Sequence, residues 1–277
     1  AGIIELTDSS RFAPLAQQDA LTVDCVESAE QVRVAIVTGG GSGIGQATCG
    51  TLASKGYCLV VVGRGSANVE DTLDSLPGGK TRHTGLVLDV TDPSAMEDMA
   101  GETLRRYGRI DLLVASAGIG QTGISQSRLP YSAADLPLAE WRGVLEVNLL
   151  GAFHACRAVL PTMLKQGMGD LVLVGSSTTP HGLRGQPFAL PYCASKFALV
   201  GLVEALSLEL EDTGVRVQLV CPGAVETPLV ANTILARPFG GAIQSNHLGE
   251  MIEKLINMPG DLSLVNPLFI PFFTAQV

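Results

Sequence analysis

Short runs of β-branched and aliphatic residues recur along this chain, separated by longer segments with helical spacing. The runs are VAIV (34–37), LVVV (59–62), LVL (86–88), LLVA (112–115), LVLV (171–174) and VRVQLV (215–220). Strands that read as continuous apolar runs are buried on both faces, which is typical of parallel sheets. Their alternation with helices predicts a doubly wound α/β fold, a parallel sheet with helices on both faces.

The segments between these runs carry helix start and stop signals. One helix is expected to end at Gly56, and another to run from Pro93 to Gly108, because proline favours the first helical turn and glycine the position after the last. Two longer helices are expected at about 138–165 and 192–212. The apolar C-terminal stretch 261–273 predicts one more strand, which gives a sheet of about seven strands.

The chain reads as one domain, residues 34–277, preceded by an N-terminal extension, residues 1–33, that docks on it or frays. Its formal charge of −9 argues against nucleic acid or an anionic membrane as a partner. No apolar run approaches the roughly 20 residues that cross a bilayer, and we expect no signal peptide, since the N-terminal residues show no basic stretch followed by an apolar one. The six cysteines and four histidines show no metal-binding spacing. We therefore expect no metal, reduced thiols and a cytoplasmic location.

A glycine-rich stretch, TGGGSGIG at 38–45, follows the first of these strands directly and leads into a helix. Glycines permit a tight turn and let the main chain approach a pyrophosphate, while the helix N-terminus faces the anion. A glycine-rich turn alone is weak evidence, but this position between strand and helix predicts a dinucleotide site. The spacing of Gly39, Gly43 and Gly45 differs from the ordinary G-x-G-x-x-G pattern.

The stretch PYCASK at 191–196 places a tyrosine and a lysine four residues apart at the expected start of a helix. Positions four apart share a helix face, so Tyr192 and Lys196 are expected to point the same way. A cation beside a phenol, together with an oxidised nicotinamide, is expected to lower the pKa of that phenol from its usual value near 10. Tyr192 could then exchange a proton with a substrate.

Together, the TGxxxGxG and YxxxK patterns resemble those of the short-chain dehydrogenase/reductase family, and the resemblance covers about residues 34–230. It implies a single Rossmann domain, an oxidoreductase that interconverts an alcohol and a ketone with NAD or NADP, and dimers or tetramers assembled through the two long helices. It also implies the catalytic residues, which are Asn148, Ser176, Tyr192 and Lys196. Ser177 is the alternative to Ser176, because the gap before Tyr192 is longer than in the family pattern.

By the same resemblance, cofactor-binding residues lie at the ends of several strands. LDV (88–90) matches the pair beside the adenine ring, and CPGAVETP (221–228) matches the segment that holds the carboxamide. ASAG (115–118) departs from the family's NNAG, so Ser116 replaces an asparagine there. The expected residues are Gly39, Ser42, Gly43, Ile44, Gly45, Arg64, Asp89, Val90, Ser116, Ala117, Gly118, Tyr192, Lys196, Pro222, Gly223, Val225 and Thr227.

The residues at the end of the run 59–62 bear on the choice of cofactor. Family members that use NAD carry an acidic residue there, which bonds the adenosine ribose. This chain has Gly63 and then Arg64, whose guanidinium can bind a 2′-phosphate. We expect NADP, with NAD as the alternative, because Ser42 stands where a second basic residue often supports NADP.

The segment after Thr227, about 228–250, is expected to be a substrate lid. Its apolar residues, with Phe188 and Leu190 across the site, favour a hydrophobic or cyclic substrate; they are Leu229, Val230, Ile234, Leu235 and Phe239. His181 and His247 are expected on loops or at the surface, with His181 near the mouth of the site. Two other functions remain open: an isomerase or lyase with transient nicotinamide chemistry, and a non-catalytic cofactor-binding regulator.

Overall fold

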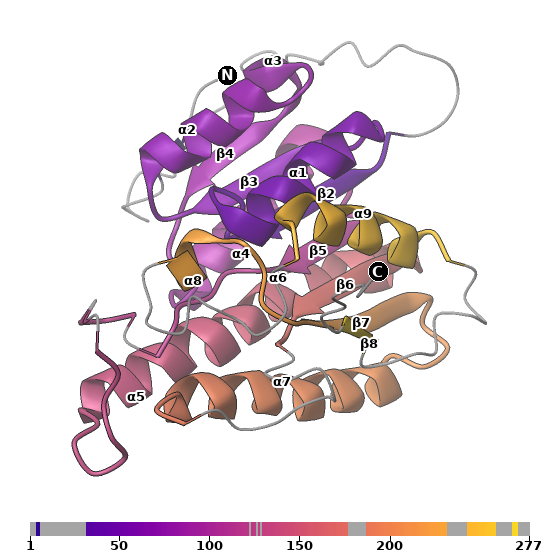
Figure 1. Cartoon of the computed structure of the whole chain (residues 1–277). Coiled ribbons are helices and arrows are strands. Elements are labelled where there is room, and N and C mark those ends of the chain that lie inside the picture. Colours follow the sequence, from indigo (N-terminus) through magenta and orange to yellow (C-terminus); the bar gives the residue numbers. More distant parts are fainter. Residues whose placement is uncertain are drawn as a thin grey trace, which may run out of the picture.

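The computed structural model describes residues 4–5, 32–121, 123–125, 127, 129–176, 187–231, 243–258 and 268–270. These residues form one parallel sheet of eight strands in the order β1-β4-β3-β2-β5-β6-β7-β8 (Figure 1). The strands are β1 (Ile4–Glu5), β2 (Val34–Thr38), β3 (Cys58–Gly63), β4 (Thr84–Val87), β5 (Leu112–Ala115), β6 (Gly169–Val174), β7 (Val215–Pro222) and β8 (Leu268–Ile270).

The helices form a layer on each face of the sheet. They are α1 (Gly43–Ser54), α2 (Ser66–Ser75), α3 (Gly79–Arg82), α4 (Pro93–Tyr107), α5 (Leu138–Leu145), the π-helix η2 (Glu146–Leu150), α6 (Gly151–Gln166), α7 (Leu190–Glu209), α8 (Pro228–Ala231) and α9 (Ser245–Ile256). One apolar core contains side chains of α4, α6 and α7, and the other contains side chains of α1, α2 and α9. The doubly wound parallel fold is therefore confirmed.

The sheet has one strand more than expected, and the difference lies at its edges. Strand β8 falls within the C-terminal stretch where a strand is expected, and it pairs with β7. Strand β1 belongs to the N-terminal extension and pairs with β4, where Ile4 faces Leu86 and Glu5 faces Val87. A two-residue strand of this kind carries no apolar run, so its pairing could not be read from the sequence.

Helix α4 shows why the helix ends were predictable. Asp92 caps it through hydrogen bonds from the main-chain N–H groups of Ser94 and Ala95, and Pro93 is its first residue. Gly108 follows its last residue with a φ of +74°, a left-handed conformation that glycine adopts without strain. Local side-chain chemistry therefore fixes both ends.

Helices α5, η2 and α6 run on without a break, close to the single helix expected at 138–165. The π-turn in its middle was not expected. This helix and α7 are long and apolar enough to cross a membrane by length and composition alone, a test that core helices of sheet proteins also pass. Both pack against the sheet here, and α7 begins at Leu190, two residues earlier than expected.

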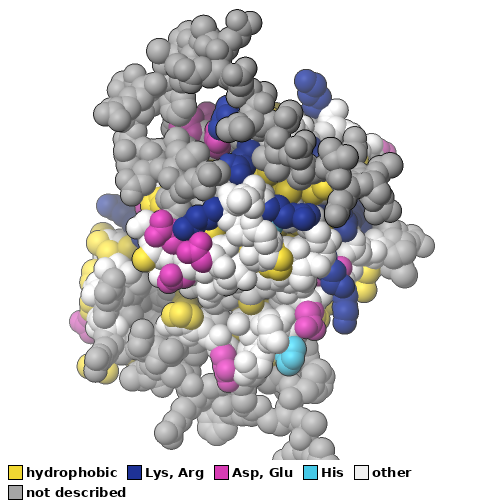
Figure 2. Space-filling view, turned by 90° about the horizontal axis from the view of Figure 1, so that it is seen from above, with side chains coloured by type: hydrophobic (Ala, Val, Ile, Leu, Met, Phe, Trp, Pro, Cys, Tyr) yellow, Lys and Arg dark blue, Asp and Glu magenta, His cyan; other side chains and the backbone are white. Residues whose placement is uncertain are grey.

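The end of the molecule formed by α2, α3 and β4 carries charges of both signs (Figure 2). Lys80 and Asp74, for example, lie 3.1 Å apart as an ion pair. The described part of this face therefore presents no uniformly basic surface of the kind that binds nucleic acid.

Candidate active site

The turn between β2 and α1 is shaped by glycines that no other residue could replace without a clash. Gly39 has a φ of +70°, and a Cβ there would lie 2.8 Å from the Cα of Ala117. A Cβ on Gly45 would lie only 2.3 Å from the main-chain oxygen of Gly39. Ser42 precedes α1 without capping it through its side chain, so the first N–H groups of the helix remain available to an anion.

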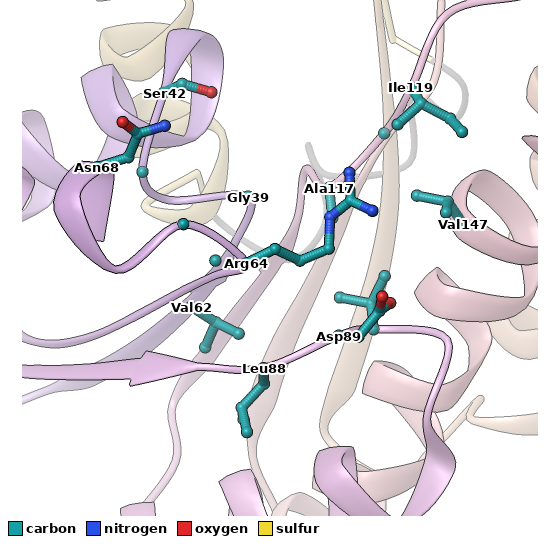
Figure 3. Close-up of a pocket in the computed structure, with 15 residues that line it drawn as sticks. Gly39, Ser42, Val62, Arg64, Asn68, Leu88, Asp89, Ala117, Ile119 and Val147 are labelled. Atoms are coloured by element: carbon teal, nitrogen blue, oxygen red, sulfur yellow. The ribbon is translucent and has the colours of Figure 1, made fainter. Parts of the chain in front are cut away.

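A crevice of about 220 Å³ opens beside this turn (Figure 3). It lies at the carboxyl ends of β2 to β5, where the chain has run outward from β2 through β3 to β4 and then returned to the other side of β2 to form β5. Ligands of open α/β sheets bind at such switch points. The lining residues are Gly39, Gly41, Ser42, Val62, Gly63, Arg64, Gly65, Asn68, Leu88, Asp89, Val90, Ala117, Gly118, Ile119 and Val147.

Seven of the residues expected to bind a cofactor line this crevice, namely Gly39, Ser42, Arg64, Asp89, Val90, Ala117 and Gly118. Ser116 lies directly behind it and donates a hydrogen bond of 2.6 Å to the main-chain oxygen of Thr38, which ties the ends of β2 and β5 together. Gly43, Ile44 and Gly45 begin α1. The segment from Pro222 through Gly223 and Val225 reaches Thr227, whose side chain would lie 3.0 Å from a Cβ on Gly43.

Arg64 follows β3 and is exposed, and its guanidinium extends over the crevice (Figure 3). It forms no hydrogen bond or ion pair with another residue that the structure describes. Asp89 differs, because its Oδ1 accepts hydrogen bonds of 2.9 Å from both the N–H and the hydroxyl of Thr91. The crevice therefore has one cationic group that the surrounding described residues do not neutralise. Asn68 also lines the crevice and was not expected from the sequence.

Tyr192 and Lys196 lie together near the start of α7, as their spacing predicts. The Nζ atom of Lys196 is 5.9 Å from the centroid of the Tyr192 ring. Lys196 is buried and donates a hydrogen bond of 2.8 Å to the main-chain oxygen of Val174, the last residue of β6. Ser176, two residues further on, forms a side-chain hydrogen bond with Tyr192. Three of the four expected catalytic residues thus meet at the ends of β6 and α7.

The sequence predicts that Lys196 and an oxidised nicotinamide together lower the pKa of Tyr192, and in the protein alone the shift has the opposite direction. Desolvation raises the pKa of Tyr192, and the hydrogen bond with Ser176 acts in the opposite direction. Burial also lowers the pKa of Lys196 to about 8, because the charged ammonium loses its hydration. Burial is thus the largest cause of both shifts in the protein alone, and the joint effect of Lys196 and an oxidised nicotinamide stays a prediction.

Asn148 lies in the π-helix η2, a local widening that often marks functional sites. Its Oδ1 accepts a hydrogen bond of 2.8 Å from the N–H of Ile119, and its Nδ2 donates bonds of 3.0 Å to the main-chain oxygen of Ile119 and 3.1 Å to Ser195 Oγ. Both polar atoms of the Asn148 amide are thus hydrogen-bonded within the protein. Ser195, which the sequence analysis did not single out, also donates to the main-chain oxygen of Tyr192 at 2.7 Å.

Other residues singled out in the sequence analysis lie at the surface. His247 is exposed on α9, and Phe188, Leu190 and Leu229 are exposed apolar side chains. The remaining ones lie outside the described residues or have side chains that are not described, namely Ser177, His181, Val230, Ile234, Leu235 and Phe239. The five cysteines among the described residues are buried thiols.

Comparisons with known proteins agree with this geometry. The family model of the short chain dehydrogenases matches residues 33–237. A putative ketoacyl reductase of Streptomyces coelicolor is 35% identical over 250 residues, which cover 82% of this chain and 90% of that protein. The chain belongs to the short-chain dehydrogenase family.

Solved structures of this family extend the likeness to the fold. A variant of actinorhodin polyketide ketoreductase with NADPH has a TM-score of 0.75 and 31% identity over 88% of this chain and 98% of that one. A 3-ketoacyl-(acyl-carrier-protein) reductase of Brucella melitensis with NADH has a TM-score of 0.74 and 25% identity over 86% of this chain and 95% of that one. This short-chain dehydrogenase is therefore an oxidoreductase that binds a nicotinamide cofactor.

The crevice fits such a cofactor. Hydrogen atoms of Gly39 and Gly45 occupy positions where any Cβ would collide with the main chain, which keeps the turn close and its N–H groups accessible. Ser42 and Asn68 lie at one end and Ile119 at the other (Figure 3). The end near Ile119 continues toward Asn148 and Lys196, since a Cβ on Gly118 would lie 3.3 Å from Asn148 Oδ1 and 3.6 Å from Lys196 Nζ.

Proposed function

We propose that this enzyme interconverts a secondary alcohol and a ketone, with Tyr192 as the proton donor and acceptor. The observation that carries this proposal is the hydrogen bond between Ser176 and Tyr192 beside the buried Lys196, at the inner end of the cofactor crevice. Two hydroxyl groups that already meet can both reach one substrate oxygen. An arrangement of this kind serves proton transfer at that oxygen.

Each residue has a distinct part in the reaction. Tyr192 delivers a proton to the carbonyl oxygen during reduction and removes it from the alcohol during oxidation. Ser176 donates a hydrogen bond to the same oxygen and shares the charge that develops there. Lys196 supplies positive charge beside the Tyr192 ring, and Asn148 fixes the main chain at Ile119. When bound, the nicotinamide supplies or accepts the hydride.

Burial affects which protonation state of Tyr192 is populated. A raised pKa keeps Tyr192 protonated at neutral pH, which suits a group that donates its proton to a ketone. Oxidation requires the phenolate, and the charge of an oxidised nicotinamide nearby would favour it. The protein alone thus favours the form of Tyr192 needed for reduction.

For the cofactor we propose NADP, with NAD as the alternative. Arg64 extends over the crevice without a described partner, and Gly63 leaves no carboxylate at the end of β3 to repel a 2′-phosphate. Ser42 and Asn68 line the same crevice and offer uncharged hydrogen-bonding groups. The related structures were solved with NADPH in one case and NADH in another, so the preference rests on these residues of the chain itself.

For the substrate we propose a hydrophobic or cyclic ketone. Phe188 lies just before α7, Leu190 is the first residue of α7 and Leu229 lies on α8, and all three are exposed apolar side chains. Helix α8 begins the segment 228–250 that we propose as the substrate lid. The name of the Streptomyces coelicolor relative, a putative ketoacyl reductase, is compatible with a substrate of this kind.

We further propose that the enzyme assembles as a homodimer or homotetramer through the helices α6 and α7. Phe153 and Leu164 of α6 and Leu208 of α7 are exposed apolar residues, and Leu208 alone is 74% exposed. A second copy of the same helices would remove these side chains from water.

Replacing Tyr192 by phenylalanine tests the proposed reaction. Consumption of NADPH with a panel of cyclic and acyl ketones should fall about 10²–10⁴-fold in Tyr192→Phe, since the proton donor is lost, while cofactor affinity by fluorescence titration stays the same. Tyr107→Phe is the control, because it removes another enclosed tyrosine hydroxyl, bonded to Thr84 at 2.8 Å and far from the crevice. Retained turnover in Tyr192→Phe would remove Tyr192 from its role.

A further inference from the structure

The connection between β5 and α5 is unusually long for a compact domain. It covers residues 116–137, whereas connections beyond roughly 12–15 residues are uncommon and usually functional. Its first part passes the catalytic groups, because Gly118 lies beside Asn148 and Lys196. We call the described residues 119–121 and 123–125 the wall segment.

The wall segment is held at two places by the same continuous helix. Asn148 binds both the N–H and the main-chain oxygen of Ile119 at its beginning. At its end, Glu140 of α5 accepts hydrogen bonds from two successive N–H groups, 3.1 Å from Ile124 to Oε2 and 2.6 Å from Ser125 to Oε1. Glu140 is only 2% exposed, so these bonds replace water that its carboxylate cannot reach.

Packing reinforces the second attachment. A Cβ on Gly143 would lie 2.5 Å from Ile124 Cδ1, so the Ile124 side chain rests directly on the helix main chain. Within the segment, the N–H of Gly123 donates to the oxygen of Gly120 at 3.1 Å and closes a turn. The segment is thus attached at both ends and folded in between.

The wall segment lies next to α8. A Cβ on Gly120 would lie 4.0 Å from Leu229 Cδ2, and Leu229 follows Thr227, the residue packed on Gly43. Figure 1 shows α8 on the same side of the molecule as the beginning of α5. A ketone that reaches Tyr192 would therefore pass close to these two elements.

We propose that Glu140 is a positioning residue that sets the width of the substrate opening by fixing the wall segment. The inference rests on the proposed function, because it assigns a purpose to the wall of that site. Glu140 touches neither substrate nor cofactor and acts through Ile124 and Ser125. A carboxylate suits this task because it offers two acceptor oxygens to two N–H groups, whereas glutamine offers one oxygen and an NH2 group that would face a second donor.

The matched pair of variants is Glu140→Gln and Glu146→Gln. Both remove one negative charge from the same continuous helix, but Glu146 is exposed and lies away from the wall segment's N–H groups. In Glu140→Gln we expect the KM for ketone to rise about tenfold, kcat to change less than about threefold and the cofactor Kd to stay constant. Glu146→Gln should leave all three unchanged. Glu140→Asp, which keeps both oxygens on a shorter side chain, should fall between wild type and Glu140→Gln.

Hydrogen exchange of the Ile124 and Ser125 amides, measured by mass spectrometry without substrate, reports on the attachment itself. Faster exchange in Glu140→Gln together with the change in KM supports the proposal. An unchanged KM, or a parallel fall of kcat, cofactor affinity and melting temperature, overturns it and leaves the proposed reaction intact. Absence of ketone turnover in the wild type overturns both, and normal exchange protection would then locate the failure in the proposed function and not in the attachment.

Discussion

Between β2 and α1 the crevice is walled by main chain and by the hydrogen atoms of glycines, whereas the neighbouring region around Tyr192 consists of buried polar side chains that are hydrogen-bonded to the protein. At Gly45 any added carbon meets the oxygen of Gly39. At Asn148 both atoms of the amide are bonded, to Ile119 and Ser195. We therefore expect the first region to lose its shape when atoms are added, and the second to lose hydrogen bonds when atoms are removed.

The most severe test of this comparison adds one methyl group to the glycine turn. Gly45→Ala should abolish measurable cofactor binding and cost about 1–3 kcal/mol of the free energy of unfolding, because the new Cβ would lie 2.3 Å from Gly39 O. Titration with NADPH and thermal unfolding measure the two effects.

The control lies on the same helix. A Cβ on Gly50 would meet no atom within 4 Å, so Gly50→Ala should bind cofactor normally and gain about 0.5–1 kcal/mol from better helix propensity. Equal behaviour of the two variants would show that the turn tolerates added atoms after all, and the contrast between the regions would be lost.

A charge reversal at Arg64 tests the cationic side chain of the cofactor region. Arg64→Asp should shift the ratio of kcat/KM for NADPH over NADH toward NADH by about 10–100-fold, since a cation for the 2′-phosphate becomes a repelling carboxylate. Steady-state rates with each cofactor at fixed ketone provide the ratio. Lys55→Asp, which reverses an exposed charge outside the lining of the crevice, is the control. A ratio that stays the same would contradict the NADP proposal.

The smallest effect is expected where one hydroxyl is removed from the catalytic region. Ser195→Ala takes an acceptor from Asn148 Nδ2 and should lower the free energy of unfolding by about 1 kcal/mol and turnover a few-fold. Denaturant unfolding and initial rates would detect both. Thr103→Val, which removes a buried hydroxyl bonded only to its own helix at Met99, should leave turnover unchanged. If Ser195→Ala matched it, the polar side chains around Asn148 would matter less than we argue.

The same contrast explains which features of the structure could be predicted from the sequence. The glycine turn, the buried strands and the ends of α4 depend on local preferences of Gly39, Asp92, Pro93 and Gly108, so their positions were predictable. The pairing of Tyr192 with Lys196 follows from helix geometry alone. These features need no knowledge of distant parts of the chain.

Features that depend on tertiary contacts could not be predicted from the sequence. The π-turn at Asn148 reflects bonds to Ile119, a residue 29 positions earlier. The raised pKa of Tyr192 comes from burial, which spacing does not reveal. Glu140 belongs to no motif, and the available signal was only an acidic residue near the start of a helix that follows a long connection. The finer roles of Ser176, Asn148 and Arg64 remain predictions.

Because of the hydrogen bond from Lys196 to Val174, the charge of this lysine can change without a change in the local structure. An amine donates a hydrogen bond whether or not it is protonated, so α7 stays joined to β6 when the side chain becomes neutral. With a pKa of about 8, that neutralisation falls within the range of common buffers. Alkaline titration can therefore remove the positive charge beside the Tyr192 ring while the atoms around it keep their places.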